Sequence, residues 1–226
     1  MAVELRANKL LSALSEKEYQ NLKYFLEPVE LSAGQELLKC GEELEYLYFP
    51  LRAIVSLILE MNNGATTEIG LIGCEGMVGK LEFIGQGVSH SRSVVQVEGS
   101  ALRIEVEALR KEFDRGKTLQ KLLLQYALTL FNQVGQIAAC NNHHTVKQRT
   151  ACCLLRLCDR HDKNKTIFMT HQMLSQMLGA RRTGISQAAK QIQQQGIIKY
   201  KRGEIQILDR QALEKVACEC YQVLKF

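Results

Sequence analysis

The sequence predicts an α+β chain in which a β-roll, a long helix and a winged helix–turn–helix follow one another. Three observations predict it: strand-like runs fill residues 28–104, an apolar period of three to four residues follows, and two short helices then precede a hairpin. A length of 226 residues allows one large domain or two modest ones. We therefore expect a β-roll domain over residues 1–107, a helix over 108–140 and a second domain over 141–226.

Strand-like runs dominate the first half of the chain, after a short helical start over residues 8–26. Glycine or asparagine separates several of these runs from the next. The step Asn63-Gly64 between two of them is typical of a hairpin turn. Short strands at this spacing favour a β-sandwich or a β-roll. The expected strands cover residues 29–31, 36–38, 46–49, 54–61, 67–72, 93–97 and 101–106.

A long amphipathic helix is expected over residues 108–139, which contain no proline. Two interpretations are open: a helix that packs on its own domain, or a dimerisation helix with a coiled-coil-like seam, and the length favours the second. We expect Leu123 and Leu130 to lie at that seam. The apolar residues that recur three or four positions apart are Leu119, Leu122, Leu123, Tyr126, Leu130, Val134, Ile137 and Ala138.

Charge is divided unevenly between the two halves of the chain. Residues 1–140 hold 14 Lys and Arg against 18 Asp and Glu, a net charge of −4, whereas residues 141–226 hold 15 against 6, a net charge of +9. A strongly basic segment joined to an acidic one indicates that the basic part meets a polyanion. Nucleic acid is the first candidate.

The basic segment has the element pattern of a winged helix–turn–helix. Thr145 and Gln148 have capping-box spacing, so a helix begins there. Thr170 is placed to cap a further short helix that ends at the turn Leu178-Gly179-Ala180. A second helix follows, Gly196 ends it, and two β runs over residues 197–200 and 205–208 form a hairpin. The second helix is expected to read DNA in the major groove, with the hairpin as a wing.

The candidate DNA-binding residues lie on these elements. Arginine suits guanine, glutamine suits adenine, and lysine suits the phosphate backbone, so base contacts are expected from the helix and phosphate contacts from the wing. The candidates are Thr170, His171, Arg181, Arg182, Thr183, Ser186, Gln187, Lys190, Lys201 and Arg202.

Several classes of protein are disfavoured. No apolar run is long enough to cross a membrane, and charged residues interrupt the first twenty, so we expect a cytoplasmic protein with no membrane partner. No Ser-His-Asp ordering, H-E-x-x-H motif or phosphate-binding loop is present, so no enzyme activity is expected.

The eight cysteines do not show the C-x-x-C spacing of common zinc or iron–sulfur sites, although Cys218 and Cys220 form a C-x-C. We interpret them as small buried hydrophobic residues plus a few surface thiols, and expect no metal. The pair His143-His144 beside Cys140 offers metal-binding side chains, but a polar helix end is the favoured interpretation.

The whole pattern resembles the Crp/Fnr family of bacterial transcription regulators. The segment Glu45-Tyr46-Leu47-Tyr48-Phe49-Pro50 and the segment from Gly73 to Gly79, GCEGMVG, resemble the cyclic-nucleotide-binding-like β-roll of that family. The segment from Leu178 to Ser186, LGARRTGIS, resembles its helix–turn–helix and is the most specific match. The resemblance implies that Arg182, Thr183 and Gln187 read operator bases, with Thr183 replacing a frequent glutamate.

The resemblance also implies an altered effector site. Family members that bind cyclic nucleotides use a Gly-Glu-Leu for the ribose and a later Arg-Ser for the cyclic phosphate. Gly79, Leu81, Arg92 and Ser93 match, but Lys80 occupies the glutamate position and has no acceptor for the ribose hydroxyl. We expect Arg92 to pair with Glu82 or Glu98, and we expect either no small ligand or an effector other than cyclic AMP.

Two functions are carried forward. The favoured one is a homodimeric, sequence-specific DNA-binding regulator on a two-fold operator, for which the resemblance adds RNA polymerase as a further partner. The alternative is an effector-binding signalling module without a direct DNA role, and the basic reader helix and wing argue against it. The iron–sulfur sensors of the family use clustered N-terminal cysteines, but the first cysteine here is Cys40. A haem role for the lone His90 is disfavoured as well.

Overall fold

The computed structural model describes residues 7–84, 88–161 and 166–225. These residues form two compact units. The N-terminal unit takes its described residues from Met1–Leu57 and Leu71–Phe131, and the C-terminal unit takes them from Ile58–Gly70 and Asn132–Phe226. The three-part division expected from the sequence stays a prediction.

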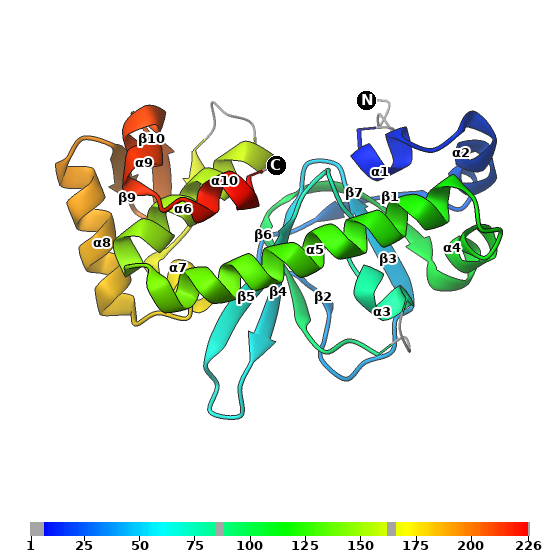
Figure 1. Cartoon of the computed structure of the whole chain (residues 1–226), viewed down its shortest axis with the longest axis horizontal. Coiled ribbons are helices and arrows are strands. Elements are labelled where there is room, and N and C mark those ends of the chain that lie inside the picture. The colour runs from blue at the N-terminus through cyan, green and yellow to red at the C-terminus, as the bar shows by residue number, and fades with distance from the viewer. Residues whose placement is uncertain (1–6, 85–87, 162–165, 226) are drawn as a thin grey trace. The chain divides into compact units, whose positions relative to one another are not determined.

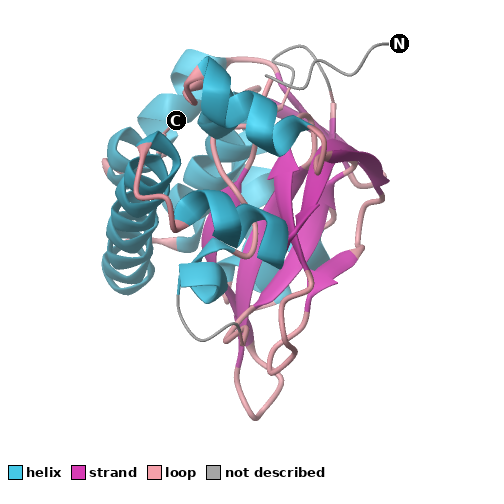
Figure 2. Ribbon diagram, turned by 90° about the vertical axis from the view of Figure 1, so that its right-hand side faces the viewer, coloured by secondary structure: helices cyan, strands magenta, loops and turns pink. Residues whose placement is uncertain are grey.

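Two sheets account for the seven strands of the first half, in the orders β1-β7-β3 and β2-β6-β4-β5. Figure 2 shows these strands in magenta. Strand β7 pairs antiparallel with both β1 and β3. The predicted strands are confirmed to within two residues at each end. Their bounds are β1 Glu27–Leu31, β2 Glu36–Leu38, β3 Tyr46–Pro50, β4 Ile54–Glu60, β5 Thr66–Ile72, β6 Arg92–Val97 and β7 Gly99–Glu105.

The predicted hairpin between β4 and β5 is present. Gly64 adopts φ +78°, which favours glycine, and the Met61 N–H donates to the Ala65 carbonyl at 2.8 Å. The hairpin tip, Ile58–Gly70, belongs to the C-terminal unit. The β4–β5 pair therefore contributes residues to both units.

Helices complete the N-terminal unit. The core combines inward residues of the first sheet, such as Phe49 and Leu102, with Leu22 of α2 and with Leu123 and Leu130 of α5, all nearly inaccessible to solvent. The expectation that Leu123 and Leu130 form a dimer seam is therefore wrong, because the unit's own strands and helices cover them. The helix bounds are α1 Lys9–Ser12, α2 Glu16–Lys23, α3 Lys80–Ile84, α4 Val106–Phe113 and α5 Thr118–His143, the last continuing into the C-terminal unit.

The single helix expected over residues 108–139 is wrong, because the chain forms α4 and α5 with a turn between them. Gly116 adopts φ +67° in this turn, a conformation that ends a helix. The carboxylate of Glu18 then accepts the backbone N–H of Leu119 at 3.0 Å, in the first turn of α5. A carboxylate from α2 thus satisfies a helix end that the sequence pattern did not reveal.

The C-terminal unit is built around α6. The predicted capping box is confirmed: the Thr145 hydroxyl accepts from the Gln148 N–H, and the Gln148 side chain accepts from the Thr145 N–H. Nearly every residue of α6 from Thr150 to Arg160 is buried, and α7, α8, α9 and α10 all contact it (Figure 1). The helix bounds are α6 Val146–Arg160, α7 His171–Leu178, α8 Arg182–Gln194, α9 Arg210–Val216 and α10 Cys220–Leu224.

A three-stranded sheet of order β8-β10-β9 completes this unit. Strands β9 and β10 form the predicted hairpin, whereas β8, α9 and α10 were not predicted from the sequence. The bounds are β8 Ile167–Phe168, β9 Ile198–Lys201 and β10 Glu204–Ile207. Among the described residues, no helix is long and apolar enough to span a membrane.

A buried ion pair connects the hairpin tip to α6 within the C-terminal unit. The Arg156 guanidinium donates to the Glu68 carboxylate at 3.0 Å, and the two side chains are 6% and 4% exposed. The Thr66 hydroxyl also donates to the Gln176 carbonyl of α7 at 3.1 Å. A buried charge is tolerated only when it is paired, so the ion pair is a strong constraint on the position of the tip.

Replacing Glu68 with Gln should destabilise the C-terminal unit, because the Arg156 guanidinium would stay buried without a carboxylate. Breaking one side of a buried ion pair costs about 3–5 kcal/mol of unfolding free energy. Urea unfolding followed by circular dichroism should show the loss. The double variant Glu68→Met/Arg156→Met should recover much of it, since two apolar side chains leave no unpaired charge. An equal loss in the single and double variants would contradict the assignment.

Candidate nucleic-acid interface

The turn between α7 and α8 has the geometry predicted from the sequence. Thr170 accepts the Met173 N–H and caps α7, and Gly179 ends the helix in the left-handed region at φ +56° and ψ +36°. A Cβ atom at Gly179 would lie 2.4 Å from the Thr67 hydroxyl, so the position excludes side chains for two reasons. Arg149 donates to the Leu178 carbonyl and satisfies the end of α7.

Helix α8 has one apolar and one polar face. Ile185, Ala188, Ala189 and Ile192 are buried against the rest of the unit. Helix α8 contacts α6. Because alanine side chains are small, Ala188 and Ala189 let the two helices cross closely. The opposite face is exposed and carries Arg182, Thr183, Gln187 and Lys190, with Arg181 exposed at the N-cap position. Every charged side chain on this face is positive.

Three of the candidate residues have partners inside the unit. Ser186 shares a hydrogen bond of 2.9 Å with His171 Nδ1, and the His171 ring stacks on Tyr200 with centroids 4.4 Å apart. The Thr170 hydroxyl is occupied in the cap of α7. These contacts connect α7, α8 and β9 beneath the exposed face of α8.

Burial and the neighbouring Arg182 charge lower the pKa of His171, which favours the neutral imidazole. A neutral ring carries one donor and one acceptor nitrogen, so a single hydrogen bond to Ser186 fixes only one of them. The other, Nε2, is buried without a hydrogen-bond partner among the described residues. The side chain therefore acts mainly as a packed, stacked support.

The β9–β10 hairpin presents charge at its turn. Lys201 pairs with Glu204 in the antiparallel register, and the two-residue turn between them is Arg202-Gly203. Arg202 adopts φ +53° and Gly203 φ +86°. Lys201 and Arg202 are both exposed. Two exposed cations thus lie at the end of a short hairpin.

The five predicted effector residues lie in the N-terminal unit. Gly79 adopts φ +85° immediately before α3, a backbone conformation that favours glycine. Lys80 and Leu81 begin α3, but their side chains lie outside the described part of the structure. Ser93 is fully buried, and its hydroxyl has no hydrogen-bond partner among the described residues.

Arg92 has a carboxylate partner that the sequence did not indicate. Its Nε donates to Glu36 of the adjacent strand β2 at 2.6 Å, and the two side chains are partly buried. Glu82, one of the two expected partners, accepts the Ser89 hydroxyl at 2.9 Å. The guanidinium that the resemblance assigns to a cyclic phosphate therefore already contacts an anion.

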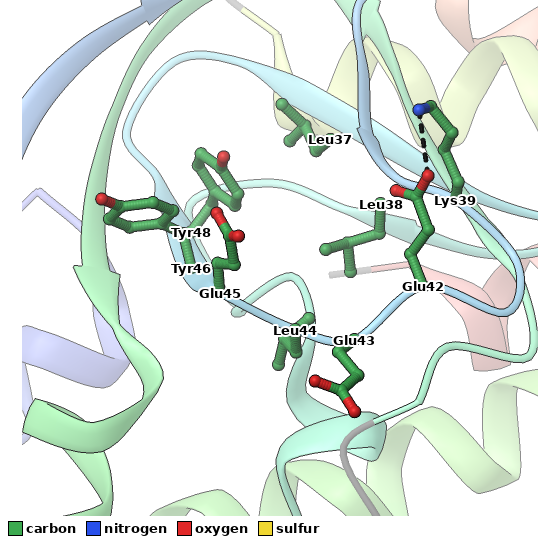
Figure 3. Close-up of a pocket in the computed structure, with 9 residues that line it drawn as sticks. All are labelled: Leu37, Leu38, Lys39, Glu42, Glu43, Leu44, Glu45, Tyr46 and Tyr48. Atoms are coloured by element: carbon green, nitrogen blue, oxygen red, sulfur yellow. Dashed lines mark hydrogen bonds and ion pairs between the residues drawn. The ribbon is translucent and has the colours of Figure 1, made fainter.

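A cavity of about 460 Å³ lies beside β2 and β3 and was not predicted from the sequence (Figure 3). Its lining includes Glu42, Glu43 and Glu45, with Lys39 paired to Glu42 at 3.0 Å. Tyr46 and Tyr48 add aromatic surface, and Leu37, Leu38 and Leu44 complete the lining. Of the predicted effector residues whose side chains the structure describes, neither Arg92 nor Ser93 lines this cavity.

Comparison with known protein families identifies both parts of the chain. A cyclic nucleotide-binding domain matches residues 28–115, and a Crp-like helix-turn-helix domain matches residues 148–216. A curated relative, lysophospholipase NTE1 of Phaeosphaeria nodorum, is 34% identical over 82 residues. That match spans 36% of this chain and only 5% of the lysophospholipase.

Solved structures share the fold along most of the chain. A putative Crp/Fnr regulator from Eubacterium rectale has a TM-score of 0.73 at 16% identity, over 93% of this chain and 98% of that one. FixK2 from Bradyrhizobium japonicum has a TM-score of 0.72 at 17% identity, over 85% and 98%.

A third structure is the c-di-GMP-responsive global regulator CLP of Xanthomonas campestris, with a TM-score of 0.68 at 15% identity over 85% and 99% of the two chains. The two matched domains follow one another along the chain, and the helix–turn–helix has the capped, glycine-ended geometry described above. The chain is therefore a transcriptional regulator of the Crp/Fnr family, with a cyclic nucleotide-binding domain followed by a Crp-like helix-turn-helix domain.

Proposed function

We propose that the protein binds a two-fold DNA operator as a homodimer, with α8 of each subunit in a major groove. The observation that carries this proposal is the exposed face of α8, whose charges are all positive and whose side chains can reach base edges. The wing and the net charge of +9 over residues 141–226 supply the attraction to phosphate.

Base reading is assigned to the first two turns of α8. Arg182 and Gln187 are exposed and have the donors and acceptors that suit guanine and adenine respectively. Thr183 offers one hydroxyl and a methyl group, which discriminate less than a carboxylate does. Ser186 and His171 hold one another, so we assign them to positioning this face rather than to base contact.

Phosphate contact is assigned to the wing and to the flanks of α8. Lys201 and Arg202 sit at the hairpin turn, where a backbone fixed by paired strands limits the entropy lost on binding. Lys190 and Arg181 lie at the edges of the exposed face of α8, and we assign no base contact to either of them. These four residues set the affinity for DNA, whereas Arg182, Thr183 and Gln187 set the sequence preference.

The dimer surface is assigned to a different face of α5 from the one expected. Leu124, Leu128 and Phe131 are 48%, 62% and 74% exposed, although each is a large apolar side chain. Their spacing of four and three residues places them on one stripe of the helix. Such a stripe on a long helix fits a coiled-coil-like contact with a second copy of the chain.

The effector site is proposed not to accept cyclic AMP in the manner of the family's nucleotide binders. Lysine at position 80 removes the acceptor for the ribose hydroxyl. Arg92 is engaged with Glu36, and a phosphate would have to displace that carboxylate. The description of one structural relative as c-di-GMP-responsive supports a change of effector on this fold.

Replacing Arg182 with Ala should relax the sequence preference at one base position per half-site, at a cost of about 1–3 kcal/mol. Replacing Arg202 with Ala should weaken binding to all sequences alike and lower the salt slope by about one per half-site. Operators selected from random DNA, titrated at several salt concentrations, separate the two effects. If Arg182→Ala weakens selected and random DNA equally, the two roles are misassigned.

Replacing Leu128 and Phe131 together with Glu should give a monomer, because charge placed at the contact would be buried without a partner. Sedimentation equilibrium checks the oligomeric state, and operator affinity should fall with it. The variant Gln125→Glu adds a charge on the exposed surface of the same helix, off the stripe, and should stay dimeric. A Leu128→Glu/Phe131→Glu protein that remains dimeric would place the interface elsewhere.

Cyclic AMP at micromolar concentration should give no heat in titration calorimetry and should not change operator affinity. The double variant Lys80→Glu/Glu36→Gln restores an acceptor for the ribose and releases the Arg92 guanidinium, so it should move the site towards nucleotide binding. Glu36→Gln alone is the matched control. Micromolar binding of cyclic AMP to the wild type, with tighter operator binding, would falsify the proposal.

A further inference from the structure

Four metal-ligating side chains from two distant segments meet inside the C-terminal unit. Cys140 lies in the last turn of α5 and His144 directly follows that helix, while Cys218 lies between α9 and α10 and Cys220 begins α10. Their ligand atoms all lie within 4.8 Å of one another. The sequence could not indicate this group, since 74 residues or more separate the two segments.

Each segment presents its two side chains through simple local geometry. Cys140 and His144 are four residues apart, and the His144 N–H donates to the Cys140 carbonyl at 3.1 Å, so the helical turn places both on one face. Cys218 and Cys220 flank Glu219, at the start of α10. A two-residue separation lets both sulfurs face the same side where the chain turns into a helix.

We propose that Cys140, His144, Cys218 and Cys220 form a structural zinc site. Three thiolates and one imidazole are a common donor set for tetrahedral zinc in proteins. Bonds of about 2.3 Å to sulfur and about 2.0 Å to nitrogen place neighbouring ligand atoms about 3.5–3.8 Å apart. The Cys140 and Cys218 sulfurs are 3.5 Å apart, and so are the Cys220 sulfur and His144 Nδ1.

The surroundings match those of a bound ion. His144 Nδ1 faces the sulfurs, and Nε2 lies 3.2 Å from the Glu219 carboxylate, which orients the ring and fixes the tautomer that ligates. Gln136 donates to the Cys220 sulfur at 3.0 Å. Arg149 lies within electrostatic range of Cys140 and Cys218, so its positive charge balances the excess of thiolate.

The site has the closed character of a structural centre. The three cysteines are buried and His144 is 14% exposed, so no open coordination position faces solvent. The ligand atoms lie too close together to surround a multi-iron cluster, and they fit one ion. A zinc ion here would join the end of α5 to α10, beside the hydrogen bond from Gln136 to the Cys220 sulfur.

The full-length protein, purified under reducing conditions without chelator, should contain about one zinc ion per chain by elemental analysis. Cys218→Ser should lose it, whereas Cys40→Ser and Cys153→Ala should keep it, because neither residue belongs to the group. Cobalt added to the chelator-treated protein should give the intense visible absorption of a tetrahedral thiolate site. The same spectrum should be absent from Cys218→Ser.

Glu219→Gln tests the positioning role of the carboxylate. Glu219 is 80% exposed, so this change should leave the folded protein intact while zinc affinity falls roughly ten- to hundredfold in competition with a chelator. Removal of zinc from the wild type should lower its melting temperature, and added zinc should restore it. Equal, trace zinc in the wild type and Cys218→Ser overturns the proposal. A disulfide between Cys140 and Cys218 that forms even in the presence of reductant and added zinc also overturns the proposal.

Discussion

The C-terminal unit depends on the pairing of one buried charge. Other elements surround helix α6 along most of its length, so most of its side chains are buried. Burial stabilises apolar side chains, but it destabilises an arginine whose charge is not paired. Arg156 lies in the C-terminal half of that helix, and Glu68, from the hairpin tip, is the carboxylate that pairs with it. Helices α7 and α8 of the helix–turn–helix pack on α6, so their arrangement depends on Glu68, which is far from them in the sequence.

Local signals made much of the fold predictable. The Thr145 capping box, the Thr170 cap and the left-handed Gly179 are each set within a few residues, so the sequence alone indicates where these helices begin or end. The periodicity of α5 was less informative. It revealed an apolar stripe but not which neighbour covers it, and therefore Leu123 was assigned to the wrong surface.

In the candidate site, too, features set by local sequence were predictable and features set by tertiary contacts were not. The exposed residues of α8 could be predicted, since they are the complement of a buried helical face. Partners that meet only through tertiary structure could not be predicted, and these include Glu36 with Arg92 and the two cysteines Cys218 and Cys220 with His144. Such pairs are separated by dozens of residues, and no local preference of the backbone brings them together.

The wing turn combines an exposed cation and a strained backbone conformation in one residue, Arg202. Arg202 adopts a left-handed backbone conformation that costs a side-chain-bearing residue about 1–2 kcal/mol, and glycine would relieve this strain. Glycine at this position would therefore favour folding stability, but it would lack the guanidinium that the proposed function assigns to phosphate. Under the proposed function, the strain at the hairpin end is the cost of placing a guanidinium where it contacts phosphate.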